Sequence, residues 1–140
     1  MGDLTTNFSA IEFASPDTGE CWIDMNLVKR LQDLRSHIGK PIIVTSGCRS
    51  VAYNRKVGGV RWSQHLTGRA ADITCTVLRI YDLAMAAALF GFHGVGIYPD
   101  RSFLHLDVRV TSGAKWAKYD GRYMAYEIGL EIAHHMRGGA

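Results

Sequence analysis

Two short segments carry two histidines and two aspartates in a pattern that suits a metal ion. His65 and Asp72 lie on either side of Gly68, and His105 and Asp107 lie two residues apart in an apolar run. Two imidazoles and one carboxylate form a three-ligand set that suits Zn²⁺ and leaves a fourth position open for water. Because an open position distinguishes a catalytic zinc site from a structural one, this set indicates metal-assisted hydrolysis.

The run at 103–107 has the alternation of a half-buried strand. In a strand, Phe103, His105 and Asp107 share one face, while Leu104 and Leu106 share the other. The imidazole and the carboxylate therefore lie side by side, and the two leucines anchor the strand in the core. A ligand on such a rigid element loses little freedom when a metal binds.

Hydrophobic spacing and turn residues predict the elements that position these side chains. We expect a short helix from Ser9, longer helices at 26–38, 77–90 and 122–136, a buried strand at 41–47, and strands at 70–76, 94–98 and 103–110, the last two paired antiparallel. Residues 50–69 are polar and contain glycines, so we expect a long functional loop there. The fold class is therefore α+β, with helices packed against a small, largely antiparallel sheet.

Length and composition limit the kinds of partner. At 140 residues we expect a single domain, 1–140, and a formal net charge of +3 without a run of Lys or Arg argues against nucleic acid. The longest apolar runs are too short for a membrane span, and the N-terminus lacks the basic and apolar regions of a signal peptide. Cys21, Cys48 and Cys75 form no CxxC pair, so we expect free thiols.

Five segments in order resemble the zinc D-Ala-D-Ala carboxypeptidase family of metallopeptidases, which also contains cell-wall endopeptidases. They are TSGCRS at 45–50, VGG at 57–59, SQHLTGRAADI at 63–73, GVGIYP at 94–99 and FLHLDVR at 103–109. The resemblance covers about residues 5–116, with 117–140 as a C-terminal helical extension. It implies the small α+β fold that the family shares with hedgehog signalling domains.

The resemblance also implies roles for individual residues. His65, Asp72 and His105 are the expected zinc ligands, and Arg49 is the expected partner of a substrate carboxylate or of the oxyanion. We place Ser63 with Arg49 among the substrate-binding residues.

The sequence leaves more than one candidate for the general base. Some relatives have a catalytic Glu or Asp three residues before the last ligand histidine, and here that position is Ser102. Asp107 is the first candidate because it shares a strand face with His105, and Asp100 is the second. Asp107 also fits a group that orients a ligand histidine. A further departure is Cys48, where relatives often have Tyr, which alters the expected wall of the substrate pocket.

For other side chains the sequence gives weaker evidence of a functional role. Trp62 and Trp116 fit the wall of a cleft and aromatic core packing almost equally well. His134 and His135 are adjacent on the last expected helix, so we do not expect them to share a metal.

The expected function is that of a zinc-dependent metallopeptidase. By the resemblance, it hydrolyses peptidoglycan stem peptides at or near D-amino acids, as a carboxypeptidase or as an endopeptidase of the endolysin type. The alternative is a non-catalytic zinc-containing module that binds the cell wall or belongs to a phage particle. We expect a monomer that is made in the cytoplasm and acts at the bacterial cell wall, released by lysis or associated with a phage. The sequence does not identify which peptide bond is cleaved.

Overall fold

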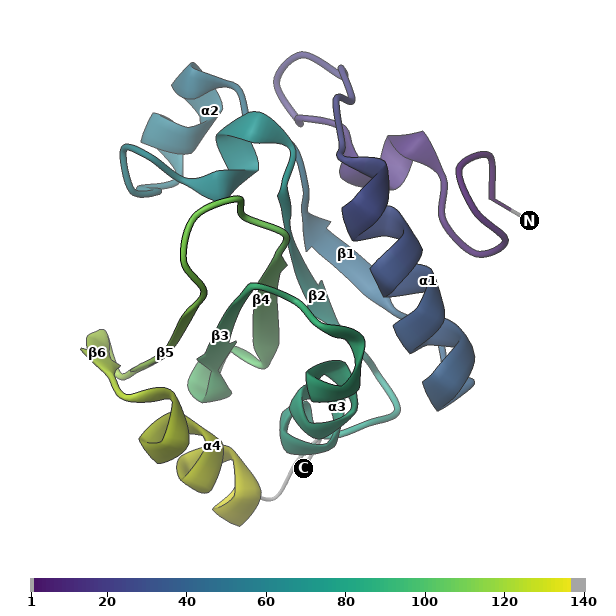
Figure 1. Cartoon of the computed structure of the whole chain (residues 1–140). Helices are drawn as coiled ribbons and strands as arrows, with labels where there is room; N and C mark the ends of the chain where they lie inside the picture. Colours follow the sequence, from purple (N-terminus) through teal and green to yellow (C-terminus); the bar gives the residue numbers. More distant parts are fainter. Residues whose placement is uncertain (1, 137–140) are drawn as a thin grey trace.

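The computed structural model describes residues 2–136, and its centre is a six-stranded sheet (Figure 1). The strands are β1 (Ile43–Ser46), β2 (Ala70–Thr74), β3 (Gly94–Tyr98), β4 (Phe103–Asp107), β5 (Ala114–Tyr119) and β6 (Arg122–Met124). Their order is β1-β2-β4-β3-β5-β6, and each neighbouring pair is antiparallel except β3 and β5. The expected α+β class with a largely antiparallel sheet is confirmed.

Helices accompany the strands in sequence. The α-helices are α1 (Met25–Ile38), α2 (Val51–Lys56), α3 (Ile80–Ala87) and α4 (Tyr126–His135), and the 3-10 turns are η1 (Ala10–Phe13), η2 (Gln64–Thr67), η3 (Ala88–Phe90) and η4 (Pro99–Arg101). The expected helix at 26–38 is confirmed: Asp24 caps α1 by accepting from the amide of Asn26, and Gly39 ends it in the left-handed region. None of the helices described within 2–136 has the length and apolar character to cross a membrane.

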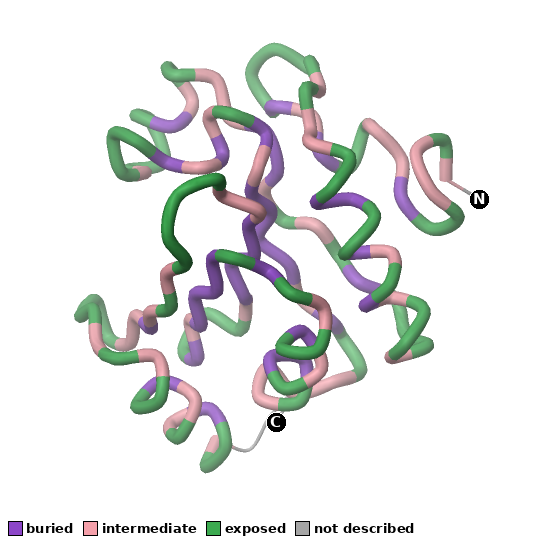
Figure 2. Tube along the Cα trace, in the orientation of Figure 1, coloured by how far each residue is buried: buried purple, intermediate pink, exposed green. Residues whose placement is uncertain are grey.

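The two faces of the sheet differ in what covers them. Leu104 and Leu106 of β4 are fully buried in the core, together with Leu27, Leu31 and Leu83 from α1 and α3. Figure 2 shows this core as buried residues along the central strands and on the inward sides of the helices. The opposite face carries the other half of each strand, including His105, so the period-two expectation for 103–107 is confirmed.

Three expectations about local structure were wrong in part. Strand β1 is a partly exposed edge strand, with Ile43 45% exposed, because β2 is its only sheet neighbour among the described strands. Residues 50–69 hold α2 and η2, since Ser50 caps α2 by accepting from the amide of Tyr53. Helix α3 begins three residues after the expected start.

The largest difference lies after residue 113. Strands β5 and β6 fill 114–124, and α4 begins at Tyr126, four residues after the expected start of the last helix. The segment 117–140 therefore opens with strands that extend the sheet. Residues 137–140 of the expected helical extension lie outside the described residues.

One row of residues crosses the sheet on the face opposite the main core. Strand register aligns Ser46 with Asp72, Asp72 with His105, His105 with Gly96, and Gly96 with Trp116. Neighbouring strands lie about 4.8 Å apart, so this row places side chains from five strands next to one another.

Candidate metal centre and its cavity

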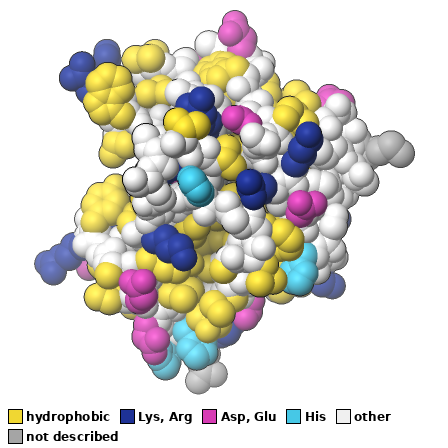
Figure 3. All heavy atoms as spheres, in the orientation of Figure 1, with side chains coloured by type: hydrophobic (Ala, Val, Ile, Leu, Met, Phe, Trp, Pro, Cys, Tyr) yellow, Lys and Arg dark blue, Asp and Glu magenta, His cyan; other side chains and the backbone are white. Residues whose placement is uncertain are grey.

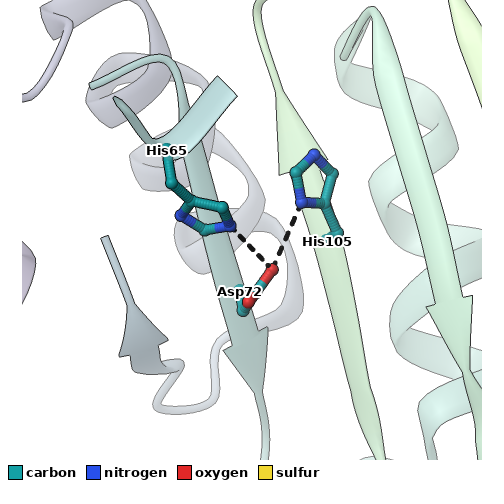
Figure 4. A group of neighbouring side chains, drawn as sticks. All are labelled: His65, Asp72 and His105. Atoms are coloured by element: carbon teal, nitrogen blue, oxygen red, sulfur yellow. Dashed lines mark ion pairs between the residues drawn. The ribbon is translucent and has the colours of Figure 1, made fainter. Parts of the chain in front are cut away.

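The three expected ligands meet at one point. His65 Nε2 and His105 Nδ1 each lie 3.3 Å from Asp72 Oδ1, and all three side chains are buried. Figure 4 shows the two rings on either side of the Asp72 carboxylate, with dashed lines for the two ion pairs. One ligand atom from each residue lies within 4.8 Å of the other two. The segments at 63–72 and 103–107 are thus brought together as the sequence predicted.

The His65 ring is oriented by the main chain. His65 lies in η2, whose N-terminal residue Ser63 accepts a hydrogen bond from the His65 amide, and Gly68 ends the turn in the left-handed region. His65 Nδ1 lies 2.7 Å from the carbonyl oxygen of Gly47. A carbonyl oxygen only accepts, so Nδ1 carries the proton, and the lone pair of Nε2 points toward Asp72.

The His105 ring is oriented by charged side chains. His105 Nε2 donates to Asp107 Oδ2 at 2.7 Å, which leaves the lone pair of Nδ1 toward Asp72. Arg109 holds Asp107 in turn, with Nη2 2.6 Å from Oδ2 and Nε 2.9 Å from Oδ1. Burial alone would lower the pKa of His105, but the carboxylates of Asp107 and Asp72 beside the ring outweigh burial and raise it. These partners make His105 a more basic ligand.

The donor set fits Zn²⁺. Asp72 Oδ1 is buried and makes no hydrogen bond in the structure, although two nitrogen lone pairs face it. Buried polar atoms are nearly always satisfied, and a cation between these three atoms would satisfy all of them. Burial would raise the pKa of Asp72, but the neighbouring His105 and His65 rings lower it well below its usual value, so the carboxylate is charged.

Arg49 contacts the centre from the segment after β1. Its Nη2 donates to Asp72 Oδ2 at 3.2 Å, its Nε to Ser46 Oγ at 3.0 Å and its Nη1 to Asn54 Oδ1 at 3.2 Å. The guanidinium therefore binds the Asp72 oxygen that does not face the two histidines. It also lines the cavity, where its expected partner, a substrate carboxylate or oxyanion, would lie.

A cavity of about 850 Å³ lies over the centre. The segment 49–65 forms one wall, and β3, β5 and β6 form the other. Trp62 is 80% exposed, so it forms a wall of the cavity and is no part of the core. Trp116 also lines the cavity, with its ring 4.9 Å from that of His105 and its Nε1 donating to the Tyr98 hydroxyl at 3.0 Å.

The two candidate bases lie outside this cavity. Asp107 has no exposed surface and lies behind His105, and its hydrogen bonds to His105 and Arg109 outweigh burial and lower its pKa. Asp100 is exposed on η4 and accepts from the amide of Asp120 at 3.0 Å. Within 2–136, Asp72 is the sole carboxylate that lines the cavity, and Ser102 lines it with a hydroxyl. For Asp107 the geometry favours the orienting role.

Sequence reasoning missed several residues around the centre. Arg109 follows the end of β4, so strand periodicity did not reveal its pairing with Asp107. Gly94 and Gly96 leave room for neighbours: a Cβ on Gly94 would overlap the Asp107 carboxyl group, and one on Gly96 would lie 2.6 Å from the Trp116 ring. The GVG pattern before a strand-like run was the available signal, because glycine inside a strand marks a close approach.

A second group of metal-type side chains lies on α4. One ligand atom each from Glu131, His134 and His135 lies within 4.8 Å of the others. The two adjacent histidines therefore approach each other more closely than we expected. All three are exposed, and the His134 ring stacks on Tyr81 at 4.4 Å. This group lacks the buried partners that orient His65 and His105.

Comparison with known proteins places this geometry in a family. A 64-residue region, 45% of the chain, is 44% identical to a quarter of the zinc D-Ala-D-Ala carboxypeptidase of Streptomyces albus G. A 92-residue region, 61% of the chain, is 32% identical to half of the peptidoglycan L,D-endopeptidase MepK of Escherichia coli K12. The chain thus spans a quarter to a half of the length of these relatives. The family model for Peptidase M15 matches residues 5–107, which include all three ligands and most of the chain, so the chain belongs to the Peptidase M15 family.

Proposed function

We propose that this chain is a zinc-dependent peptidase that hydrolyses peptidoglycan stem peptides at or near D-amino acids. The observation that carries the proposal is the convergence of His65 Nε2, His105 Nδ1 and an otherwise unpaired Asp72 Oδ1 at the floor of a cavity. Three such ligands leave a fourth position toward the cavity, as in catalytic zinc sites. One relative is named as a zinc D-Ala-D-Ala carboxypeptidase and the other as a peptidoglycan L,D-endopeptidase; the two names support this substrate class, and the second supports action at the cell wall.

The residues divide the work of such a site. His65, Asp72 and His105 would hold the zinc ion, and the chemistry that zinc supplies when bound is acidification of a water molecule and polarisation of the scissile carbonyl. Asp107 holds the His105 ring in one tautomer and one orientation. Ser63 caps the turn that carries His65 and lines the cavity, where its hydroxyl proton is free to bind substrate.

Two donors face the place where negative charge develops. Arg49 lines the cavity beside Asp72, and Tyr98 lines it with a hydroxyl that accepts from Trp116 and still carries its own proton. Burial raises the pKa of Tyr98, so the phenol remains a donor at neutral pH. Preorganised donors of this kind stabilise an oxyanion because they need no reorientation during the reaction.

A direct test combines metal content with product analysis. Purified protein should bind about one zinc ion per chain, as three ligands at one point require, and should release products from defined stem peptides as identified by mass spectrometry. A chelator should abolish hydrolysis, and added zinc should restore it. Hydrolysis that persists after all metal has been removed would contradict the proposal.

One observation favours a second function, a non-catalytic module that binds the wall through its zinc site. The described lining of the cavity offers no carboxylate besides the ligand Asp72 to accept the proton of the attacking water. In that case the zinc-loaded protein would sediment with purified cell walls and release no peptide from them. The same mass-spectrometric assay therefore separates the two functions.

A further inference from the structure

The basic side chains that line the cavity fall into two groups. Arg49 is paired with Asp72, and Arg109 is paired with the buried Asp107. Arg101 and Lys118 also line the cavity, and neither forms an ion pair with any residue in 2–136. Each cation of the first group already faces a carboxylate of the protein, whereas neither cation of the second group does.

The two unpaired cations lie on elements that contact each other. Arg101 is in η4, the turn that joins β3 to β4, and Lys118 is on β5, which pairs with β3. A hydrogen bond from the Asp120 amide to Asp100 Oδ2, 3.0 Å long, ties the η4 turn to the turn after β5. Arg101 therefore lies on a turn that is tied to the end of β5, the strand that carries Lys118.

Lys118 is positioned against aromatic side chains. It lies on the same face of β5 as Trp116, two residues further along, and its Nζ is 4.9 Å from the centre of the Tyr123 ring. Trp116 contacts the His105 ring at 4.9 Å and hydrogen-bonds to Tyr98 at 3.0 Å. The indole thus acts as a fixed spacer between the metal centre and the end of the cavity that holds Lys118.

Strand geometry gives the length of that spacer. Two strand separations of about 4.8 Å and two residues along β5 place the Cα of Lys118 about 12 Å from the Cα of His105. An extended peptide advances about 3.3 Å per residue, so a substrate bound along this wall reaches Lys118 about three residues from its scissile bond.

We propose that Lys118, with Arg101 beside it, binds a substrate carboxylate about three residues from the scissile bond and so makes the enzyme selective for acidic stem peptides. This inference rests on the proposed function, because it concerns the substrate of the same cavity. The free α-carboxylate of a γ-linked D-Glu has this chemistry and this distance from a terminal D-Ala-D-Ala bond. Conversion of that carboxylate to a carboxamide removes the charge and leaves the shape nearly unchanged.

The test uses two pentapeptides, L-Ala-γ-D-Glu-L-Lys-D-Ala-D-Ala and the same peptide with D-isoglutamine in the second position. For the zinc-loaded wild type we expect kcat/KM to be about tenfold higher for the carboxylate form, as one partly exposed charged contact provides. Lys118→Met should reduce this preference to about twofold or less, and Lys118→Arg should retain it. Raising the salt concentration should weaken it in the wild type, because exposed charges are screened.

Lys115→Met is the matched control. Lys115 is on the same strand, faces the other side of the sheet, and lies 5.6 Å from the Tyr126 ring in a similar cation–π contact. Lys115 does not line the cavity, and the Lys115→Met variant loses the same charge as Lys118→Met. Its preference for the carboxylate form should equal that of the wild type.

Calorimetric binding of both peptides separates failure of this inference from failure of the proposed function. If the wild type cleaves neither peptide but binds the carboxylate form more tightly, and only Lys118→Met loses that difference, the subsite stands and the proposed cleavage of this peptide fails. An equal preference in wild type and Lys118→Met, by hydrolysis or by binding, would overturn the inference while leaving peptidase activity intact.

Discussion

His65 and His105 are both expected ligands, but the protein holds them in different ways. His65 is oriented by a main-chain carbonyl at Gly47, whereas His105 is oriented by the Asp107 carboxylate, which is held by Arg109. A carbonyl oxygen cannot be altered by substitution without moving the backbone, whereas a carboxylate can be replaced directly. The orientation of His65 is therefore a property of the fold, and that of His105 can be tuned by single side chains.

The largest effect is expected from removing either histidine ring, and the two substitutions should have the same result. His65→Ala and His105→Ala should both lose zinc on dialysis and lose hydrolytic activity, because two protein ligands do not complete the site. Zinc content measured by mass spectrometry checks this. His37→Ala, which removes an exposed histidine on α1, should keep both zinc and activity. Full zinc and activity in His105→Ala would refute the ligand assignment.

A smaller effect should separate the two histidines. Asp107→Asn weakens the partner of His105 alone, so zinc affinity should fall about 10- to 100-fold. It also leaves Arg109 without its carboxylate, and the free energy of unfolding should drop by about 3 kcal/mol or more. Competition with a chromophoric chelator measures the affinity, and urea denaturation measures the stability.

Asp82→Asn is the control for this prediction. Asp82 forms an exposed pair with Arg79 on α3, so its loss should change stability by less than about 1 kcal/mol. If Asp107→Asn retained wild-type zinc affinity but lost turnover, Asp107 would act as the base and not as the orienting group.

The smallest effect compares two glycines, one behind each histidine. A Cβ on Gly47 would lie 2.7 Å from the Cα and carbonyl oxygen of Phe13, whereas one on Gly94 would meet the end of the Asp107 side chain. Both Ala variants should lose about 1–3 kcal/mol of unfolding free energy, as overpacked sites do, because the backbone resists movement at Gly47, and because His105 and Arg109 hold the Asp107 carboxyl group in place at Gly94.

Thermal unfolding measures the stability of the two variants. Gly113→Ala is the surface control, and its new Cβ would lie 3.1 Å from its nearest neighbour. Equal stability of Gly47→Ala and wild type would show that the backbone behind His65 can move. The contrast between a ligand oriented by the fold and one oriented by side chains would then disappear.

The sequence brought out the three candidate ligands because each stands in a short local pattern. His105 and Asp107 follow strand alternation, and the ordered segments supply His65 and Asp72 through a family resemblance. The contact of Arg49 with Asp72, 23 residues further along the chain, was out of reach because it depends on tertiary placement, which single-sequence patterns do not encode. The pairing of Arg109 with Asp107 is local, and it was missed because Arg109 lies beyond the end of β4.

Errors in the elements have a similar cause. Residues 51–56 make a helix too short to show a full hydrophobic period, so they looked like loop. Met124, Ile128 and Ile132 have helical spacing, and this pattern drew the expected helix back over β6, where Tyr123 pairs with Lys118. A strand that joins a sheet edge is decided by its neighbour, which lies elsewhere in the chain.

The row from Ser46 through Asp72, His105 and Gly96 to Trp116 makes the metal centre a product of strand pairing. A slip of β4 by one residue would bring Leu104 or Leu106 to the position of His105 and put a hydrocarbon where the third ligand belongs. His65 lies outside this row, on η2 in the connection between β1 and β2. An insertion in that connection can displace His65, whereas Asp72 and His105 stay aligned as long as the hydrogen bonds between β2 and β4 are kept.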